Sequence, residues 1–254
     1  CALPISAVPV NASGMSDAQL TALSGSIGGV SSISNLSVSN NQSSTELGNL
    51  LGKATGATVN ASGMNKARLS AVSSNIERVA SISNLSVSNE QSAIELGNLL
   101  GKTSGASVDA SGMVDAGKLS AVAANAGNVA DGGITNLAVG AAQTDVELGQ
   151  LLGKATGATV DADLMTKEQL TAVSGRISNV ASISHLSVNA DQSSDELTNL
   201  LGKTSGASVN AGDMSKEQLT AVYGRIGNVG TIANLSLRSE EHTSELQSHS
   251  DLVC

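Results

Sequence analysis

The sequence predicts an α/β solenoid of parallel strands and helices, with about ten coils in five double repeats of 49 residues. Three observations indicate it: a fixed repeat length, helix-start signals twice in each repeat, and a near absence of aromatic residues. The chain has no Phe or Trp and one Tyr. Aromatic side chains bury the most area per residue, so many thin core layers fit this composition better than one thick core.

The repeat length is set by five methionines, each inside a version of VNASGM. They are Met15, Met64, Met113, Met165 and Met214, spaced 49, 49, 52 and 49 residues apart. Such self-similarity is typical of repeat arrays, in which stacked neighbours bury a continuous core. We expect the methionines to fill that core.

Each repeat holds two turns, and the second turn carries the clearer helix. Its start is a capping box, in which a Ser or Thr is followed three residues later by Glu. These pairs are Ser43 and Glu46, Ser92 and Glu95, Thr144 and Glu147, and Ser193 and Glu196. Leu47, Leu50 and Leu51, with their copies, follow at helical spacing. We expect the next glycines to end the helix in the left-handed conformation: Gly52, Gly101, Gly153 and Gly202.

The first turn has the same order of strand and helix. Ser16, Thr166 and Ser215 stand three residues before Gln19, Gln169 and Gln218, again as capping boxes. Parallel strands need crossover connections, and a helix is the usual one. We therefore expect strands to start at Val10, Leu36, Val59, Leu85, Val108, Leu137, Val160, Leu186, Val209 and Leu235.

The third repeat is longer, with an extra residue near Val114 and the DGG of residues 131–133. We interpret both insertions as looser loops at helix edges. A stack of ten strands at about 4.8 Å each predicts a sheet about 45 Å long.

The strand of the second turn reads Ile33-x-x-Leu36-x-Val38-x-x-Asn41. It resembles the leucine-rich-repeat pattern L-x-x-L-x-L-x-x-N, which implies a leucine-rich-repeat-like fold. The first turn departs from that pattern, with Val10 and Ala12 at leucine positions. The phrases LLGKATGATVNASGM and ADGGITNL resemble repeats of very large bacterial surface proteins, particularly marine ones, which implies a secreted or cell-surface location.

The two ends do not continue the repeat. Residues 238–249 match the translation of a short-read sequencing adapter, and its reverse complement translates as Cys-Ala-Leu-Pro-Ile, which is the sequence of residues 1–5. We therefore expect residues 1–6 and 238–254 to be adapter-derived, and residues 7–237 to be a single repeat array, itself a fragment. Without those ends the array has no cysteine, one histidine and a net charge of -6, from 12 basic and 18 acidic residues.

Composition and spacing exclude several classes of function. The mild acidity argues against a nucleic-acid groove, and no run approaches the roughly 20 apolar residues of a membrane span. The Glu row and the Lys row, which is Lys53, Lys102, Lys154 and Lys203, stand at helix starts and ends, where they complement the helix dipole. We therefore expect no catalytic residues, no metal site and no cofactor.

His185 and the Asn/Asp row that begins with Asn11 are the remaining candidates for ligand binding. His185 replaces the asparagine of its row, which comprises Asn35, Asn84, Asn136 and Asn234. We expect this row to hydrogen-bond to neighbouring backbone. Asn11 and its copies carry oxygen atoms that could bind calcium, but spacing argues against it. Equivalent residues lie two coils apart, about 10 Å, whereas oxygens lie about 2.4 Å from a bound Ca²⁺.

The function that these observations favour is non-enzymatic. We expect a fragment of a large secreted or cell-surface bacterial protein that serves as a stalk, spacer or adhesive scaffold. The alternative is a solenoid that recognises a polysaccharide, a protein or ice through its strand face. The residues of that face are Asn11, Ser37, Asn60, Ser86, Asp109, Asp161, Ser187 and Asn210. Apolar layers near Val10 and Leu235 would be uncapped, which predicts end-to-end self-association.

Overall fold

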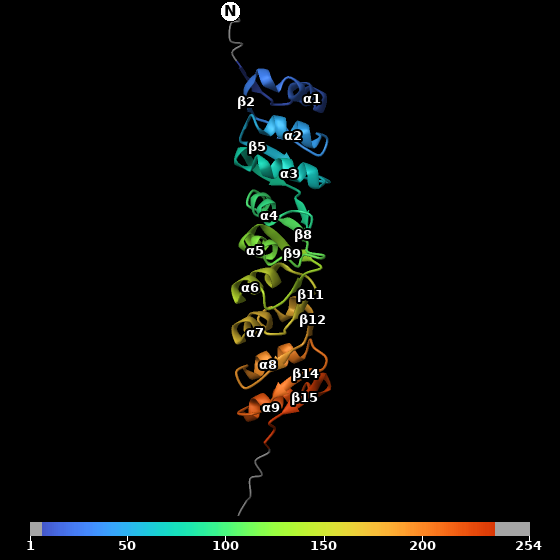
Figure 1. Cartoon of the computed structure of the whole chain (residues 1–254), viewed down its shortest axis with the longest axis vertical. Helices are drawn as coiled ribbons and strands as arrows, with labels where there is room; N and C mark the ends of the chain where they lie inside the picture. The colour runs from blue at the N-terminus through green and yellow to red at the C-terminus, as the bar shows by residue number, and fades with distance from the viewer. Residues whose placement is uncertain (1–6, 237–254) are drawn as a thin grey trace, which may run out of the picture.

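The computed structural model describes residues 7–236, which form one elongated column (Figure 1). The predicted adapter-derived segments, residues 1–6 and 238–254, lie outside the described residues. The nine α-helices of the described part are α1 Asp17–Gly25, α2 Ser44–Leu51, α3 Lys66–Ser74, α4 Ala93–Leu100, α5 Ala116–Ala124, α6 Asp145–Lys154, α7 Lys167–Ser174, α8 Ser194–Leu201 and α9 Lys216–Tyr223. A single 3-10 turn follows each first-turn helix, at Ile27–Gly29, Ile76–Arg78, Ala126–Asn128, Ile177–Asn179 and Ile226–Asn228.

Short strands start within two residues of nine of the ten predicted starts, and the predicted order of strand then helix is confirmed. The strands are β1 Val8–Asn11, β2 Val30–Ser34, β3 Ser37–Val38, β4 Ala54–Thr55, β5 Ala57–Asn60, β6 Val79–Ser83, β7 Ser86–Ser88, β8 Ala106–Asp109, β9 Val129–Thr135, β10 Ala138–Val139, β11 Ala158–Asp161, β12 Val180–Ser184, β13 Ser187–Val188, β14 Ala207–Asn210 and β15 Val229–Ala233. Leu235, the tenth predicted start, lies one residue before the end of the described part, so that part does not contain the strand expected after it.

Every strand pairing is parallel. From one repeat to the next, the set of paired strands is displaced by five residues along the chain direction. Val10 pairs with Ile33, and Ile33 pairs with Ala54. The next ladder begins five residues further along the same coil, because Val38 rather than Ile33 pairs with Val59. The result is five three-stranded sheets in steps: β1-β2-β4, β3-β5-β6, β7-β8-β9, β10-β11-β12 and β13-β14-β15. In Figure 1 the strands β2 and β5 lie left of the helices, whereas β8 to β15 lie right of them, so the strand face winds around the column.

The corners between successive strands take the left-handed conformation. Asn35, between β2 and β3, has φ 53°, and Gly56, between β4 and β5, has φ 74°. The prediction that Gly52 and its copies take this conformation is wrong: Gly52 has φ -58°, Gly101 and Gly202 are also right-handed, and the remaining copy lies inside α6. The left-handed glycine stands four residues after Gly52, where the chain turns from one short strand into the next.

The insertion at residues 131–133 lies inside a strand, so its interpretation as a loop at a helix edge is wrong. It lengthens β9 to seven residues. The pairing with β8 skips three residues between Ala106 and Val108, whereas the equivalent pairings skip one. Gly132 has φ 69°, and a Cβ on Gly133 would lie 2.8 Å from the carbonyl oxygen of Ala130. The insertion is therefore a glycine-dependent bulge. The extra residue near Val114 does lie in an exposed turn before α5.

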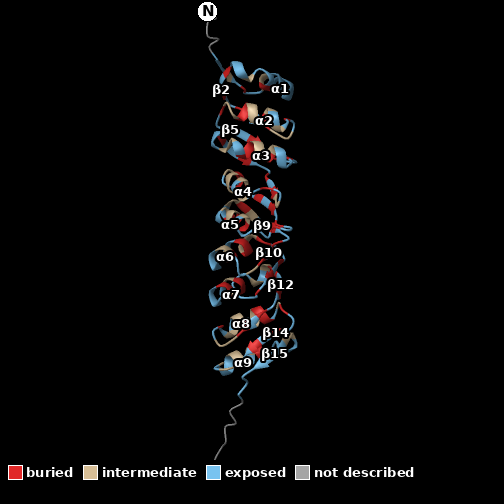
Figure 2. Ribbon diagram, in the orientation of Figure 1, coloured by how far each residue is buried: buried red, intermediate tan, exposed pale blue. Residues whose placement is uncertain are grey.

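One hydrophobic cluster runs from the first coil to the last (Figure 2). Leu47, Leu50 and Leu51 of α2 are fully buried, as are their copies in α4, α6 and α8. All the predicted capping boxes are formed, in both kinds of turn. Helices of eight to ten residues are marginal by themselves, so the caps and this shared core hold them in place. The methionines contact the same cluster, and Met64 and Met113 are buried in it.

Candidate functional site

The eight residues predicted for a binding face lie in exposed positions on the strands. Five of them end the first strand of each repeat: Asn11, Asn60, Asp109, Asp161 and Asn210. The other three begin the strand after the asparagine corner: Ser37, Ser86 and Ser187. The structure places both rows on the surface of the strand face, and it gives them different surroundings.

The Asn/Asp row is engaged in hydrogen bonds within the fold. Oδ1 of Asn60 accepts from the backbone N–H of Ser62 at 3.2 Å and from Nδ2 of Asn84, in the next coil, at 3.0 Å. The same two bonds recur in all five repeats. The pairs across the coils are Asn11 and Asn35, Asn60 and Asn84, Asp109 and Asn136, Asp161 and His185, and Asn210 and Asn234.

These pairs correct the expectation for the row that contains His185. Its side chains bond to a side chain 24 to 27 residues earlier, not to neighbouring backbone. All five residues have positive φ, from 51° to 57°. Asparagine tolerates this conformation best among residues with a side chain, which accounts for its use here. The row therefore fixes the corner and joins two coils at once.

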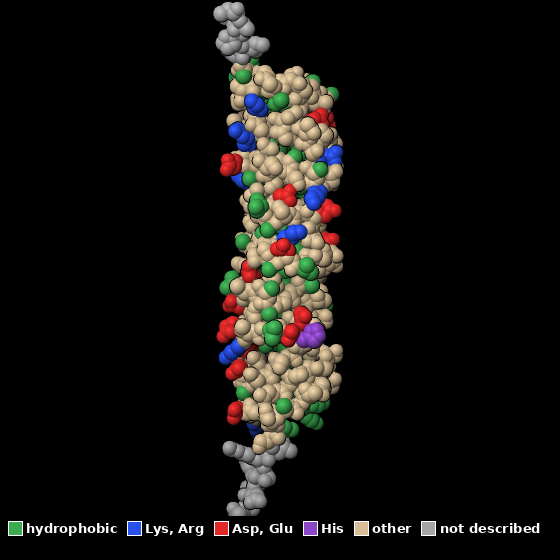
Figure 3. All heavy atoms as spheres, viewed as in Figure 1, with side chains coloured by type: hydrophobic (Ala, Val, Ile, Leu, Met, Phe, Trp, Pro, Cys, Tyr) green, Lys and Arg blue, Asp and Glu red, His purple; other side chains and the backbone are tan. Residues whose placement is uncertain are grey.

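Among these five pairs, the one between His185 and Asp161 is the ion pair. Nδ1 of the histidine lies 2.8 Å from Oδ1 of Asp161. In Figure 3 the histidine is the purple side chain on the surface of the column. The hydrogen bond to Asp161 and then its negative charge raise the pKa of His185. The same bond, followed by the backbone N–H of Asp163, lowers the pKa of Asp161. Both side chains are more than half exposed, so solvent screens the attraction.

The serine row, unlike the Asn/Asp row, is not engaged in side-chain hydrogen bonds within the described residues. The hydroxyls of Ser37, Ser86 and Ser187 make no hydrogen bond within residues 7–236, and all three are exposed. They point away from the core because the neighbouring Val38, Val87 and Val188 occupy the buried side of the strand. A ligand on the strand face would find these hydroxyls available, whereas the Oδ1 atoms of the Asn/Asp row are already used.

Sequence reasoning missed a row of buried glutamines: Gln42, Gln91, Gln143 and Gln192. Their exposed fractions are 1% to 4%. Oε1 of Gln91 accepts the backbone N–H of Ser88 at 2.8 Å, and the other three make the equivalent bond. The next helix then donates back to this loop, for example from Nε of Arg68 to the carbonyl of Gln42 at 2.8 Å. The signal in the sequence was a Gln directly before every second-turn cap.

The helix side carries a second polar connection between coils. The capping Glu95 also accepts a hydrogen bond from the hydroxyl of Ser70, one coil earlier. This bond, followed by the backbone N–H of Ser92, lowers the pKa of Glu95. Beside it, Nδ2 of Asn98 donates to Oγ of Ser73 at 3.1 Å. The predicted role of the Glu row at helix starts is confirmed, and the row also holds adjacent coils together.

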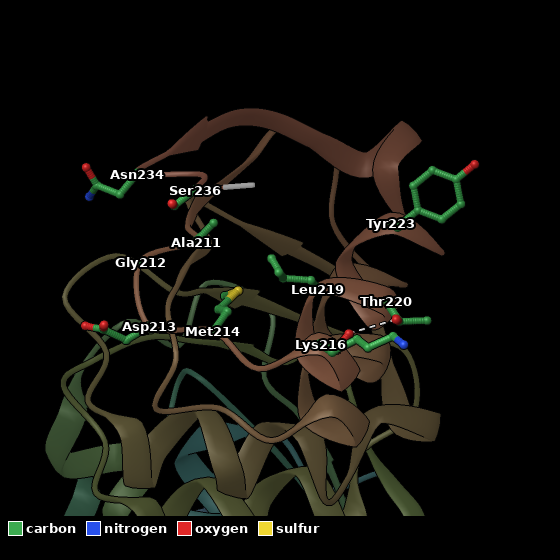
Figure 4. A pocket seen from close by; sticks show the side chains of 10 residues that line it. All are labelled: Ala211, Gly212, Asp213, Met214, Lys216, Leu219, Thr220, Tyr223, Asn234 and Ser236. Carbon is green, nitrogen blue, oxygen red and sulfur yellow. Dashed lines mark hydrogen bonds between the residues drawn. The ribbon is translucent and has the colours of Figure 1, made fainter. Parts of the chain in front are cut away.

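A hollow at the C-terminal end of the described column is lined by Ala211, Met214, Leu219, Tyr223 and Asn234, among others (Figure 4). The tyrosine ring extends away from the other side chains in that view. At the equivalent positions inside the column the next coil covers the surface, since Leu69 and Leu119 are buried. The hollow is therefore the end face of the stack rather than a closed ligand cavity.

Charged groups are scattered over the column (Figure 3). Among the described residues, no group of three or more His, Cys, Asp or Glu side chains could hold a metal ion. Nor is any helix in residues 7–236 long and apolar enough to cross a membrane.

The fold and these rows define the class of protein: a solenoid of parallel strand–helix units. No protein-family model matches the chain. No curated protein matches it either. Among solved structures, the leucine-rich repeat-containing protein LegL7 from Legionella pneumophila is similar over 89% of this chain and 82% of its own, with 16% identity and a TM-score of 0.25. The class rests on the strand and helix geometry described above.

Proposed function

We propose that this chain is a non-enzymatic scaffold, part of a large secreted or cell-surface bacterial protein in which it acts as a stalk or spacer. The observation that carries the proposal is the single hydrophobic core, which passes through every coil from Ala12 to Val222 without a break. A stack of this kind has a length proportional to its number of repeats. The surface location is supported by the resemblance of its repeat phrases to those of bacterial surface proteins.

The junctions between coils support a rigid spacer rather than a flexible linker. In the first four repeats, the junction between the two coils combines strand pairing with a side-chain bond on each side of the core. At the junction of α3 and α4 these are Asn84 to Asn60 on the strand face and Asn98 to Ser73 on the helix face. Two connections on opposite sides of a core resist bending in both directions.

A direct test measures the length that each repeat adds. The chain is displayed between a membrane anchor and a fluorescent domain, and residues 57–105 are duplicated once or twice between Gly105 and Ala106. A rigid spacer moves the fluorescent domain outward by about 10 Å for each added pair of coils. Distance measurements by energy transfer to a membrane dye report this shift. A distance that does not grow with repeat number would refute the spacer function.

The second candidate is recognition of a polysaccharide, a protein or ice by the strand face. The observation in its favour is the row of free hydroxyls at Ser37, Ser86 and Ser187. These residues also provide a cleaner test than the Asn/Asp row, because a change at Asn60 removes hydrogen bonds of the fold itself.

The recognition test replaces all three serines by lysine in the displayed chain. The matched control places three lysines on the helix side, at the equivalent exposed positions Thr45, Ile94 and Val146 of α2, α4 and α6. Recognition through the strand face requires that attachment to glycan surfaces, cells or ice is lost in the serine variant and kept in the control. Equal attachment of both variants would exclude this face as the binding surface.

A further inference from the structure

The first coil differs from its four copies at the residues that contact a preceding coil. In each later copy of β1, the second residue donates its backbone N–H to a leucine carbonyl of the coil before. The four bonds, 2.9 to 3.0 Å long, are Thr58 to Leu36, Ser107 to Leu85, Thr159 to Leu137 and Ser208 to Leu186. The first coil has Pro9 at this position, and proline has no N–H to donate. Proline on an edge strand prevents further strand pairing.

The residue before this proline changes as well. Ala57, Ala106, Ala158 and Ala207 are buried, with exposed fractions of 0% to 1%. The first coil has Val8 there, and its exposed fraction is 59%. Two added methyl groups at a position that is closely packed in every other copy would overpack a junction of the internal kind.

A third difference lies on the 3-10 turn after the helix. Asn128, Asn179 and Asn228 each donate from Nδ2 to a carbonyl of the preceding coil, that of the last leucine in its helix. The acceptors are Leu100, Leu152 and Leu201, at 2.7 to 2.9 Å. Arg78 at the equivalent position donates to the carbonyl of Ala54 at 3.3 Å. The first coil has Gly29, which has no side-chain donor.

We propose that β1 and α1 form a capping coil, whose outer face, defined by Val8, Pro9 and Gly29, does not accept another coil of this array. The three changes remove a backbone bond, a side-chain bond and a tight packing contact of the internal junctions. The array is then directional: repeats can be added inside it, but an identical repeat cannot stack on its first coil. This goes beyond the spacer function, since it holds whatever the array supports. It also differs from the expectation that the layer near Val10 is uncapped.

The test compares two places for one added repeat in the full chain. In the first protein, a copy of residues 57–105 is fused directly before Val8. In the second, the same copy is inserted between Gly105 and Ala106. Because two coils cannot bury their core alone, an undocked repeat is expected to exchange its amide hydrogens on the order of 100-fold faster than the inserted one. Hydrogen exchange with mass spectrometry measures this difference for the identical peptides of the two proteins.

A third protein decides whether the three residues are the cause. It is the N-terminal fusion with Val8→Ala, Pro9→Thr and Gly29→Asn, which restores the internal residues. The proposal expects the added repeat to become protected and to unfold together with the rest of the column. It is overturned if the unmodified N-terminal repeat is already as protected as the inserted one. It is equally overturned if the three substitutions leave the added repeat unprotected.

Discussion

Nδ1 of His185 lies 2.8 Å from Oδ1 of Asp161, at a corner where three of the other repeats join two asparagines and one joins an aspartate to an asparagine. The repeats therefore allow the same corner to be compared with a histidine, at residue 185, and with an asparagine, in the other four repeats.

The first prediction follows from that comparison and concerns pH. The pKa of His185 is raised in the folded chain by its bond to Asp161. The stabilisation by the protonated histidine is therefore fully present below its ordinary pKa of 6.5 and is lost as the pH rises through the higher folded value. We expect the melting temperature of the wild type to fall across this range. His185→Asn, which restores the residue of the other repeats, should abolish that fall, and an unchanged pH profile would contradict the assignment.

The second prediction concerns acid. The pKa values of Glu95 and Glu147 are lowered, mainly by side-chain hydrogen bonds from Ser70 and Ser120 respectively. The pKa of Glu46 is lowered in the same way by a hydrogen bond from Thr21. A carboxylate with a lowered folded pKa stabilises the fold above its ordinary value of 4.5, and that stabilisation is lost as the pH falls through the folded pKa. Urea denaturation should show a steep loss of stability below pH 4.5. Glu95→Gln keeps a capping residue and should reduce the steepness, whereas Glu77→Gln, for which no partner exists in the described chain, should leave it unchanged.

The third prediction concerns two buried hydroxyls. Oγ1 of Thr103 and of Thr204 is buried and has no hydrogen-bond partner. The same row carries Ala54 and Ala155 in other repeats, so the hydroxyl is dispensable. Thr103→Val removes an unsatisfied polar group and should raise the free energy of unfolding by about 1 kcal/mol.

The control for this threonine is Thr55, whose Oγ1 donates to the carbonyl of Ile33 at 3.2 Å. Thr55→Val should lose about 0.5 to 1 kcal/mol, because a formed hydrogen bond is removed. Chemical denaturation of both variants measures the two signs. Destabilisation by Thr103→Val would mean that its hydroxyl has a partner in solution.

The fourth prediction concerns the buried glutamine row. Gln91→Leu leaves the backbone N–H of Ser88 without its acceptor in a site that is 2% exposed. Such a loss costs about 1 to 3 kcal/mol of unfolding free energy. The neighbouring Glu90→Ala, at an exposed position, should change stability by less than about 0.5 kcal/mol. Similar values for the two variants in urea denaturation would show that the buried bond contributes little.

The features that could be predicted from the sequence are those encoded within a few residues. A capping box is complete in four residues, so Ser43 and Glu46 identified the start of α2 correctly. The two glycines of LGKATG are four residues apart, and only the path of the backbone decides that Gly56 rather than Gly52 takes the left-handed conformation. The local sequence does not specify the path of the backbone at these two glycines.

The candidate site was predictable in position but not in its bonding. Alternation along the strands correctly placed Asn60 and Ser86 on the exposed face. The bond from Asn84 to Asn60 spans 24 residues, so it depends on the stacking register, which no local pattern specifies. Buried Gln91 was missed although its bond is local, to the backbone N–H of Ser88 three residues earlier, and the Gln before each second-turn cap was its signal.

The displacement of five residues per repeat limits the shape of any ligand that could contact the strand face in several repeats at once. Because Val38, not Ile33, lies beneath Val59, equivalent side chains such as Ser37 and Ser86 follow a spiral path along the column. A flat crystal lattice touches a spiral only where it faces the plane, within a short stretch of repeats. A flexible polymer can follow the spiral and engage every repeat, so multivalent attachment would select for chain-like ligands and would strengthen with the number of coils that the ligand wraps.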